Sequence, residues 1–78
     1  MEKSNHQITW SECSRLLNEG KGYVHVKYID SIGEKRTAYP ESLEEALRIK
    51  KLTGSGYSIW YDTPVGCKQV IHDDGSEI

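Results

Sequence analysis

The side chains of this chain that are best suited to chemistry are three histidines and two cysteines, and they are scattered. They are His6, Cys13, His25, Cys67 and His72. A structural zinc site needs four ligands at short spacings and a redox pair needs Cys-x-x-Cys, and neither pattern occurs. Nothing resembles a nucleophile elbow, a pair of catalytic carboxylates or a Cys–His arrangement. We therefore expect no metal, no cofactor and no enzymatic activity, with both cysteines reduced.

Two Gly-x-Gly sequences, over residues 20–22 and 54–56, are candidates for phosphate-binding loops. A phosphate cradle needs backbone amides at the beginning of a helix. Both sequences instead follow predicted helices, so we interpret their glycines as helix ends and turns.

Binding chemistry is better represented, because aromatic and basic residues recur at alternate positions of the predicted strands. Alternate residues of a strand point to the same side of a sheet. The face predicted to be free of helices carries His25, Lys27, Ile29, Lys35, Thr37, Tyr39, Trp60, Lys68, Val70 and His72. Such a face could stack the bases of a single-stranded nucleic acid, or form a protein interface anchored on Trp60. An ordinary solvated sheet face is the third interpretation.

The first elements that position these residues are a helix and a hairpin. Thr9 and Glu12 form a capping box and Gly20 ends the helix, which is predicted over residues 10–19. A strand over residues 23–29 follows, and a three-residue loop ending in a glycine turns the chain back. The register of that hairpin pairs Ile29 with Lys35, Tyr28 with Arg36, Val26 with Ala38 and His25 with Tyr39. Its core side is predicted to carry Val24, Val26, Tyr28 and Ala38.

A second helix and hairpin follow in the same order. A capping box beginning at Ser42 opens a helix that runs to about Thr53. Strands over residues 57–62 and 67–72 are joined by a tight turn containing Pro64. A three-residue loop there predicts pairing of Asp62 with Lys68, Trp60 with Val70 and Ile59 with Ile71.

The apolar residues of the second helix cover a wider arc than one sheet-facing stripe needs. They are Leu43, Ala46, Leu47, Ile49 and Leu52. Either Ile49 and Leu52 face a partner or another copy of the chain, or they fold over the edge of the domain. The sequence leaves these two interpretations open.

Together these elements predict a single α+β domain with the order αββαββ. Both units share a capping box, a Gly-x-Gly-Tyr exit from the helix and a glycine in the hairpin turn, which indicates an internal repeat. We expect a four-stranded, largely antiparallel sheet with both helices on one face. The expected organisation is a flexible leader over residues 1–7, the domain over 8–72 with units 8–39 and 42–72, and a mobile acidic tail over 73–78. A short extra strand is the alternative for the residues before Ile8.

Composition narrows the class of partner. The 78 residues carry a net charge of −2, with 28% charged and 36% hydrophobic residues, so no global basic field favours nucleic acid or membrane. The chain begins with polar residues and has no apolar run long enough to span a membrane, so we expect a cytoplasmic location. A chain this short has a thin core, and a homodimer or a larger partner would add stability.

One stretch of the chain is similar to half of a SPOR-type peptidoglycan-binding domain. The residues that carry the resemblance are Tyr23-Val24-His25-Val26, Ser42, Glu45-Ala46, Leu52 and Gly56-Tyr57. The similarity covers about half of the chain. The sequence departs from the family's pattern in its missing first strand and its additional last strand, and we assign no family from it.

The function predicted from the sequence is that of a small protein-binding module, an inhibitor or adaptor that occupies a surface on a larger protein. Its size suits a phage- or plasmid-encoded modulator of a host system. The predicted partner-binding residues are His25, Lys27, Lys35, Tyr39, Ile49, Leu52, Trp60 and Val70. The alternative is single-stranded nucleic-acid binding through the aromatic and basic sheet face.

Overall fold

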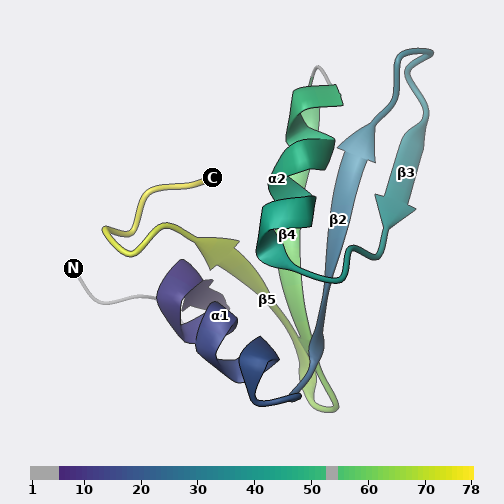
Figure 1. Ribbon diagram of the computed structural model, residues 1–78. Coiled ribbons are helices and arrows are strands. Elements are labelled where there is room, and N and C mark those ends of the chain that lie inside the picture. Colours follow the sequence, from purple (N-terminus) through teal and green to yellow (C-terminus); the bar gives the residue numbers. More distant parts are fainter. Residues whose placement is uncertain (1–5, 53–54) are drawn as a thin grey trace.

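The structure, a computed structural model, describes residues 6–52 and 55–78, and describes the side chains of all of these except Leu52 and Ser55. Over these residues the chain forms two helices and five strands, with two consecutive strands after each helix (Figure 1). Their bounds are β1 Gln7–Thr9, α1 Trp10–Asn18, β2 Tyr23–Ile29, β3 Lys35–Ala38, α2 Leu43–Leu52, β4 Ser55–Thr63 and β5 Gly66–Ile71.

The five strands form one mixed sheet in the order β1-β5-β4-β2-β3. The α+β class is confirmed, but the predicted four-stranded sheet is wrong by one strand. The additional strand is β1, which pairs in parallel with β5 through Ile8 opposite Val70. Gln7, which we expected in the leader, begins this strand, and residues 1–5 lie outside the described residues. Because Thr9 both ends β1 and caps α1, the chain enters the sheet and the helix without a loop.

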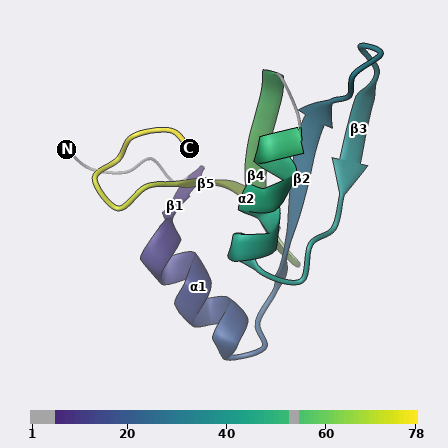
Figure 2. The ribbon, with the colours of Figure 1, turned by 45° about the horizontal axis from the view of Figure 1, so that its top comes forward.

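Both helices pack on the same face of the sheet, and one hydrophobic core lies between the two layers (Figures 1 and 2). The predicted caps are confirmed at Thr9 and Ser42: the Glu12 amide donates to Thr9 Oγ1 at 3.3 Å and the Glu45 amide to Ser42 Oγ at 3.1 Å. The return bond of the second capping box differs from the prediction, since Glu45 Oε2 accepts from the Glu41 amide at 3.1 Å. These caps satisfy amides that a helix leaves unpaired at its first turn. The buried core residues are Ile8, Cys13, Val24, Val26, Leu43, Ala46, Ile59, Tyr61 and Val70.

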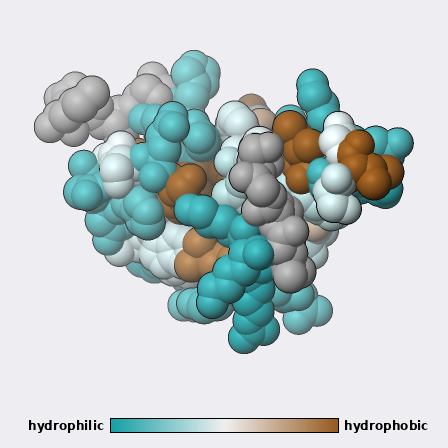
Figure 3. Space-filling view, turned by 90° about the horizontal axis from the view of Figure 1, so that it is seen from above, coloured by the Kyte–Doolittle hydropathy of each residue, from teal (hydrophilic) through white to brown (hydrophobic). Residues whose placement is uncertain are grey.

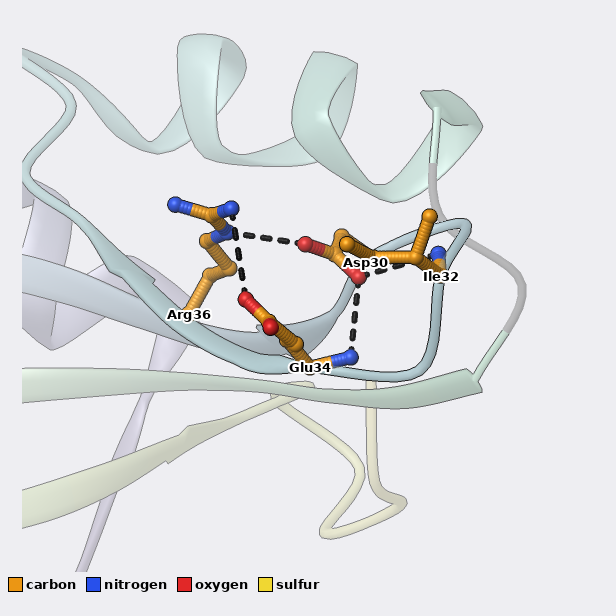
Figure 4. Close-up of polar contacts among 4 residues, drawn as sticks. All are labelled: Asp30, Ile32, Glu34 and Arg36. Carbon is orange, nitrogen blue, oxygen red and sulfur yellow. Dashed lines mark hydrogen bonds and ion pairs between the residues drawn. The ribbon is translucent and has the colours of Figure 1, made fainter.

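The register of the first hairpin, β2 with β3, is the predicted one. Val26 lies opposite Ala38 and Ile29 opposite Lys35. Asp30 organises the turn, since its carboxylate accepts hydrogen bonds from the Ile32 and Glu34 amides and from Arg36 Nε (Figure 4). These bonds lower the pKa of Asp30 below its usual value, with the Arg36 bond the largest cause.

The register of the second hairpin, β4 with β5, differs from the prediction by one residue. Thr63 lies opposite Gly66 and Trp60 opposite Gln69, so the loop has two residues and not three. The Thr63 side chain closes this tighter turn by donating to the Gly66 carbonyl at 2.8 Å and accepting from the Val65 amide. A slip of one residue exchanges the two faces of a strand. The predicted pairs of Asp62 with Lys68, Trp60 with Val70 and Ile59 with Ile71 are therefore wrong.

The pairing of β2 with β4 joins the two hairpins, and it contains a bulge near the beginning of β4. Lys27 lies opposite Ser58 and Ile29 opposite Ser55, so Gly56 and Tyr57 together face the single residue between them on β2. Gly56 has φ +66°, and a Cβ there would lie 2.6 Å from the Ile29 side chain. Glycine is therefore required both by the backbone and by the close approach of Ile29.

The C-terminal residues, expected to be a mobile tail, form a turn that returns to the sheet. The His72 amide donates to the Ser76 carbonyl at 2.9 Å, and Glu77 bridges to Ile71. Asp73 accepts hydrogen bonds from the Ser11 amide, at 3.0 Å, and from the Ser11 hydroxyl. A carboxylate at this first turn of α1 complements the positive end of the helix dipole.

No helix among the described residues is long and apolar enough to cross a membrane.

Candidate functional site

The candidate site is the face of the sheet opposite the helices, which we call the open face. Because side chains alternate along a strand, the odd-numbered residues of β2 and β3 and the even-numbered residues of β4 point to this side. Its central side chains are His25 and Lys27 from β2, Lys35 and Thr37 from β3, Tyr39 after β3, and Ser58, Trp60 and Asp62 from β4.

His25 and Asp62 form the polar centre of the open face. His25 Nδ1 lies 2.6 Å from Asp62 Oδ2, and the two side chains are only 12% and 22% exposed. This contact is a hydrogen bond donated by His25 in the tautomer that carries the proton on Nδ1, with the Asp62 carboxylate as acceptor. The bond fixes the imidazole ring on the sheet.

The rings of Trp60 and Tyr39 flank the His25 ring. The Trp60 ring is nearly parallel to that of His25, with centroids 6.4 Å apart and 13° between the planes. The Tyr39 ring lies 6.1 Å from His25 at 50°. Trp60 Nε1 donates to Ser58 Oγ at 3.0 Å, and Lys27 Nζ lies over the Trp60 ring at 5.6 Å. Trp60 is thus half-buried and held on several sides.

The outer part of the open face is more exposed and carries two tyrosines. Tyr39 is 75% exposed and Tyr23, opposite Asp62 on β2, is 70% exposed. Aromatic side chains that remain this exposed offer apolar area together with a hydroxyl, which is typical of interface residues. The fixed Trp60 and His25 rings and the accessible tyrosines form a nearly continuous aromatic strip across β4, β2 and β3.

A shallow depression of about 480 Å³ adjoins this strip towards the β2–β3 turn. Residues of β2, β3 and β4 line it, among them Lys27, Lys35, Thr37, Gly56 and Ser58. Two ammonium groups and two hydroxyls are donors for an anionic or polar group of a partner.

The structure brings together five of the eight residues predicted to bind a partner. His25, Lys27, Lys35, Tyr39 and Trp60 all lie on the open face. Val70 was predicted wrongly: the one-residue slip of β5 turns it to the other face, where it is 1% exposed in the core. Ile49 packs partly buried against the core, and the side chain of Leu52 lies outside the described residues.

Asp62 and Tyr23 belong to the site although the prediction omitted them. The sequence contained a signal for both. Tyr23 lies two residues before His25 and Asp62 two residues after Trp60, and residues two apart in a strand point to the same side of the sheet. The contact between His25 and Asp62 had no such signal, because it depends on β2 and β4 being neighbours. The same strand order separates β2 from β5, which keeps His72 away from His25.

The cysteines have contrasting environments, with Cys13 buried in the core and Cys67 exposed beside Asp62. Burial, with a smaller effect of the Glu12 charge, raises the pKa of the Cys13 thiol to about 12. Over the described ranges 6–52 and 55–78, no three His, Cys, Asp or Glu side chains are grouped as metal ligands.

Exposed apolar residues also lie at the two hairpin tips, at opposite ends of the sheet (Figure 1). Ile32 is 74% exposed in the β2–β3 turn, where Figure 3 shows hydrophobic surface seen from above. Val65 is 97% exposed in the β4–β5 turn. Each is a single side chain on a hairpin tip, in contrast to the grouped side chains of the open face.

Comparison with known proteins adds no relative: no protein-family model, no curated protein and no solved structure matches this chain.

Proposed function

We propose that this protein is a small, non-catalytic binding module whose open face occupies a surface on a larger protein, as an inhibitor or an adaptor. The observation that carries the proposal is the aromatic strip of Trp60, His25, Tyr39 and Tyr23 on a sheet face that neither helix covers. Interfaces concentrate their binding energy in such clustered aromatic anchors, surrounded by polar residues that exclude water.

The charges of the open face define the chemistry of the partner. Its basic residues are Lys27 and Lys35, whereas its carboxylate, Asp62, is already bonded to His25. The face therefore has a local positive excess in a chain of net charge −2. Complementary potentials favour a partner surface that is apolar at its centre and acidic near the β2–β3 side.

The position of Lys27 favours a protein partner over a nucleic acid. Its ammonium group lies 5.6 Å over the Trp60 ring and covers part of the ring surface on which a base would stack. A protein surface needs no free Trp60 ring face, because the exposed Tyr23 and Tyr39 side chains offer it apolar area.

Single-stranded nucleic-acid binding is the second candidate function, and the depression beside Lys27 and Lys35 favours it. Two lysines, with Thr37 and Ser58 beside them, would contact phosphates there while Tyr39 stacks a base. The two functions differ in their response to salt, because phosphate contacts weaken steeply as salt rises.

The test is capture of partners from cell extract by the tagged protein, with and without nuclease, compared among three proteins. Tyr39→Ala removes an exposed aromatic ring of the open face without disturbing the core, and Val65→Ala removes an even more exposed side chain at a hairpin tip. The proposal expects a stoichiometric protein that survives nuclease and salt of roughly 0.5 M, is lost with Tyr39→Ala and is kept with Val65→Ala. Recovery of nucleic acid alone, lost with nuclease or salt, would establish the second candidate instead.

A further inference from the structure

The outer edge of β3 offers backbone hydrogen-bonding groups that no described element uses. β3 is the last strand in the sheet order, and Figures 1 and 2 show no other helix or strand beyond it. An exposed edge of this kind pairs with another strand unless charge, proline or a bulge prevents it, so the positions of Lys35, Arg36 and Pro40 restrict which pairings are possible.

The register identifies the residues whose backbone groups point outward. The Asp30 amide donates to the Glu34 carbonyl at 2.9 Å, which makes these two a hydrogen-bonded pair. Hydrogen-bonded and non-hydrogen-bonded pairs alternate along an antiparallel ladder. The backbone of Arg36 therefore bonds to β2, whereas the N–H and C=O groups of Lys35 and Thr37 point away from the sheet.

We infer that this edge pairs with the same edge of a second copy of the chain, antiparallel, with Thr37 opposite Thr37 of the second copy. In this register Lys35 lies opposite Tyr39 of the second copy on both sides of the two-fold axis. Tyr39 is 75% exposed, so its ring is accessible to the Lys35 ammonium group and stem. The Thr–Thr pair at the centre is also favourable across strands.

Other registers are less favourable. A register with Arg36 opposite Arg36 of the second copy places two guanidinium groups against each other, and a register with Lys35 opposite Lys35 places two ammonium groups against each other. Moving the two-fold axis beyond Thr37 loses pairs, because β3 ends at Ala38 and the edge does not continue as a strand. In the inferred register Arg36 faces the small Ala38 of the second copy, and its guanidinium is turned to Asp30 and Glu34 of its own hairpin (Figure 4).

The product is a symmetric dimer with one continuous sheet and two open faces side by side. Because β3 has only four residues, the interface is smaller than that of a stable obligate dimer, and we expect reversible association at high protein concentration. This inference does not rest on the proposed function, although Lys35 and Tyr39 take part in both; Thr37→Pro changes the strand edge while leaving both of these side chains in place.

Sedimentation measured over a wide range of concentrations tests whether the dimer forms. Thr37→Pro removes an N–H that points away from the sheet and bonds to none of the described strands, and prolines are tolerated on edge strands. We expect it to leave the circular dichroism spectrum unchanged and to weaken dimerisation by about tenfold or more, because it removes the donors of the central pair. A mass that stays monomeric at every concentration, or a dimer unaffected by Thr37→Pro, would overturn the inference.

Disulfide crosslinking in a Cys67→Ser background tests the register separately. Residues paired across the new ladder have Cα atoms about 5.5 Å apart, within disulfide range. Thr37→Cys should crosslink to itself, as should a mixture of Lys35→Cys and Tyr39→Cys. Lys35→Cys alone should not, because its two copies would lie roughly 14 Å apart. Equal crosslinking of Lys35→Cys and Thr37→Cys would refute the register.

Discussion

The hydroxyl of Tyr61 occupies the space that a side chain at position 22 would need. A Cβ built on Gly22 would lie 2.6 Å from Tyr61 Oη and 2.6 Å from the Asp62 carbonyl oxygen. The same hydroxyl donates to the Lys21 carbonyl at 2.9 Å. The loop between α1 and β2 is thus held against β4 by one phenol, and β4 also carries the centre of the open face.

Gly22→Ala should destabilise the fold more than Gly20→Ala. Both glycines have left-handed backbone, with φ +69° and +77°, but a Cβ at Gly20 meets nothing within 4 Å. We expect a loss of about 1 kcal/mol for Gly20→Ala from backbone strain alone, and about 2–4 kcal/mol for Gly22→Ala, which adds overpacking. Urea unfolding measures both, and equal losses would show that the contact with Tyr61 carries no energy.

The hydrogen bond between His25 and Asp62 should appear as a coupling energy between β2 and β4. Both side chains are mostly buried, so removing either leaves its partner unsatisfied at a cost of about 1–3 kcal/mol. A double-mutant cycle with His25→Ala and Asp62→Ala should give a coupling of about 1 kcal/mol or more. Ile32→Ala, at the far hairpin tip, should be additive with Asp62→Ala and is the matched control.

The two cysteines should differ sharply in alkylation. Burial raises the pKa of Cys13 to about 12, so at pH 8 almost none of it is thiolate, whereas Cys67 is exposed. Iodoacetamide should modify one cysteine in the native protein and two in denaturant, and Cys67→Ser should abolish the native reaction. Rapid native modification of Cys13 would contradict its place in the core.

The contact between Asp73 and Ser11 should make the free energy of unfolding depend on pH in the acidic range. Hydrogen bonds from Ser11 hold the pKa of Asp73 below its usual value of 3.8. A carboxyl with a lowered pKa in the folded state contributes stability that is complete above its unfolded pKa and is lost as the pH falls through the folded pKa. Urea midpoints between pH 2 and 6 should therefore fall less steeply for Asp73→Asn than for the wild type. Ser11→Ala should reduce the slope in the same way, and the double variant should add nothing further.

Local chemistry made the helices and the first hairpin predictable from the sequence. Thr9 and Ser42 cap the helices as their motifs indicate. Asp30 closes its turn with bonds to residues at most six positions away. These interactions involve near neighbours, so residue types at fixed spacing specify them before any tertiary contact forms.

The second hairpin was less predictable because its turn residues suit two loops. Thr63, Pro64 and Gly66 are compatible with a three-residue loop, but the Thr63 side chain closes a two-residue turn. Burial of Val70 against Ile8 of β1 agrees with the shorter loop. That burial depends on a strand from the other end of the chain.

By itself the sequence determined the α+β class, the two helices, their caps, the register of β2 with β3, and the grouping of His25, Lys27, Lys35 and Tyr39. Tertiary structure alone decided the strand order, the addition of β1, the face of Val70 and the meeting of His25 with Asp62. It also placed the two tyrosines of the repeated Gly-x-Gly-Tyr sequence on opposite faces, since Tyr23 is exposed on the open face while Tyr57 packs against the core. The physical reason is that period-two patterns define the two faces of each strand, whereas only the shared core selects which strands are neighbours and in which register.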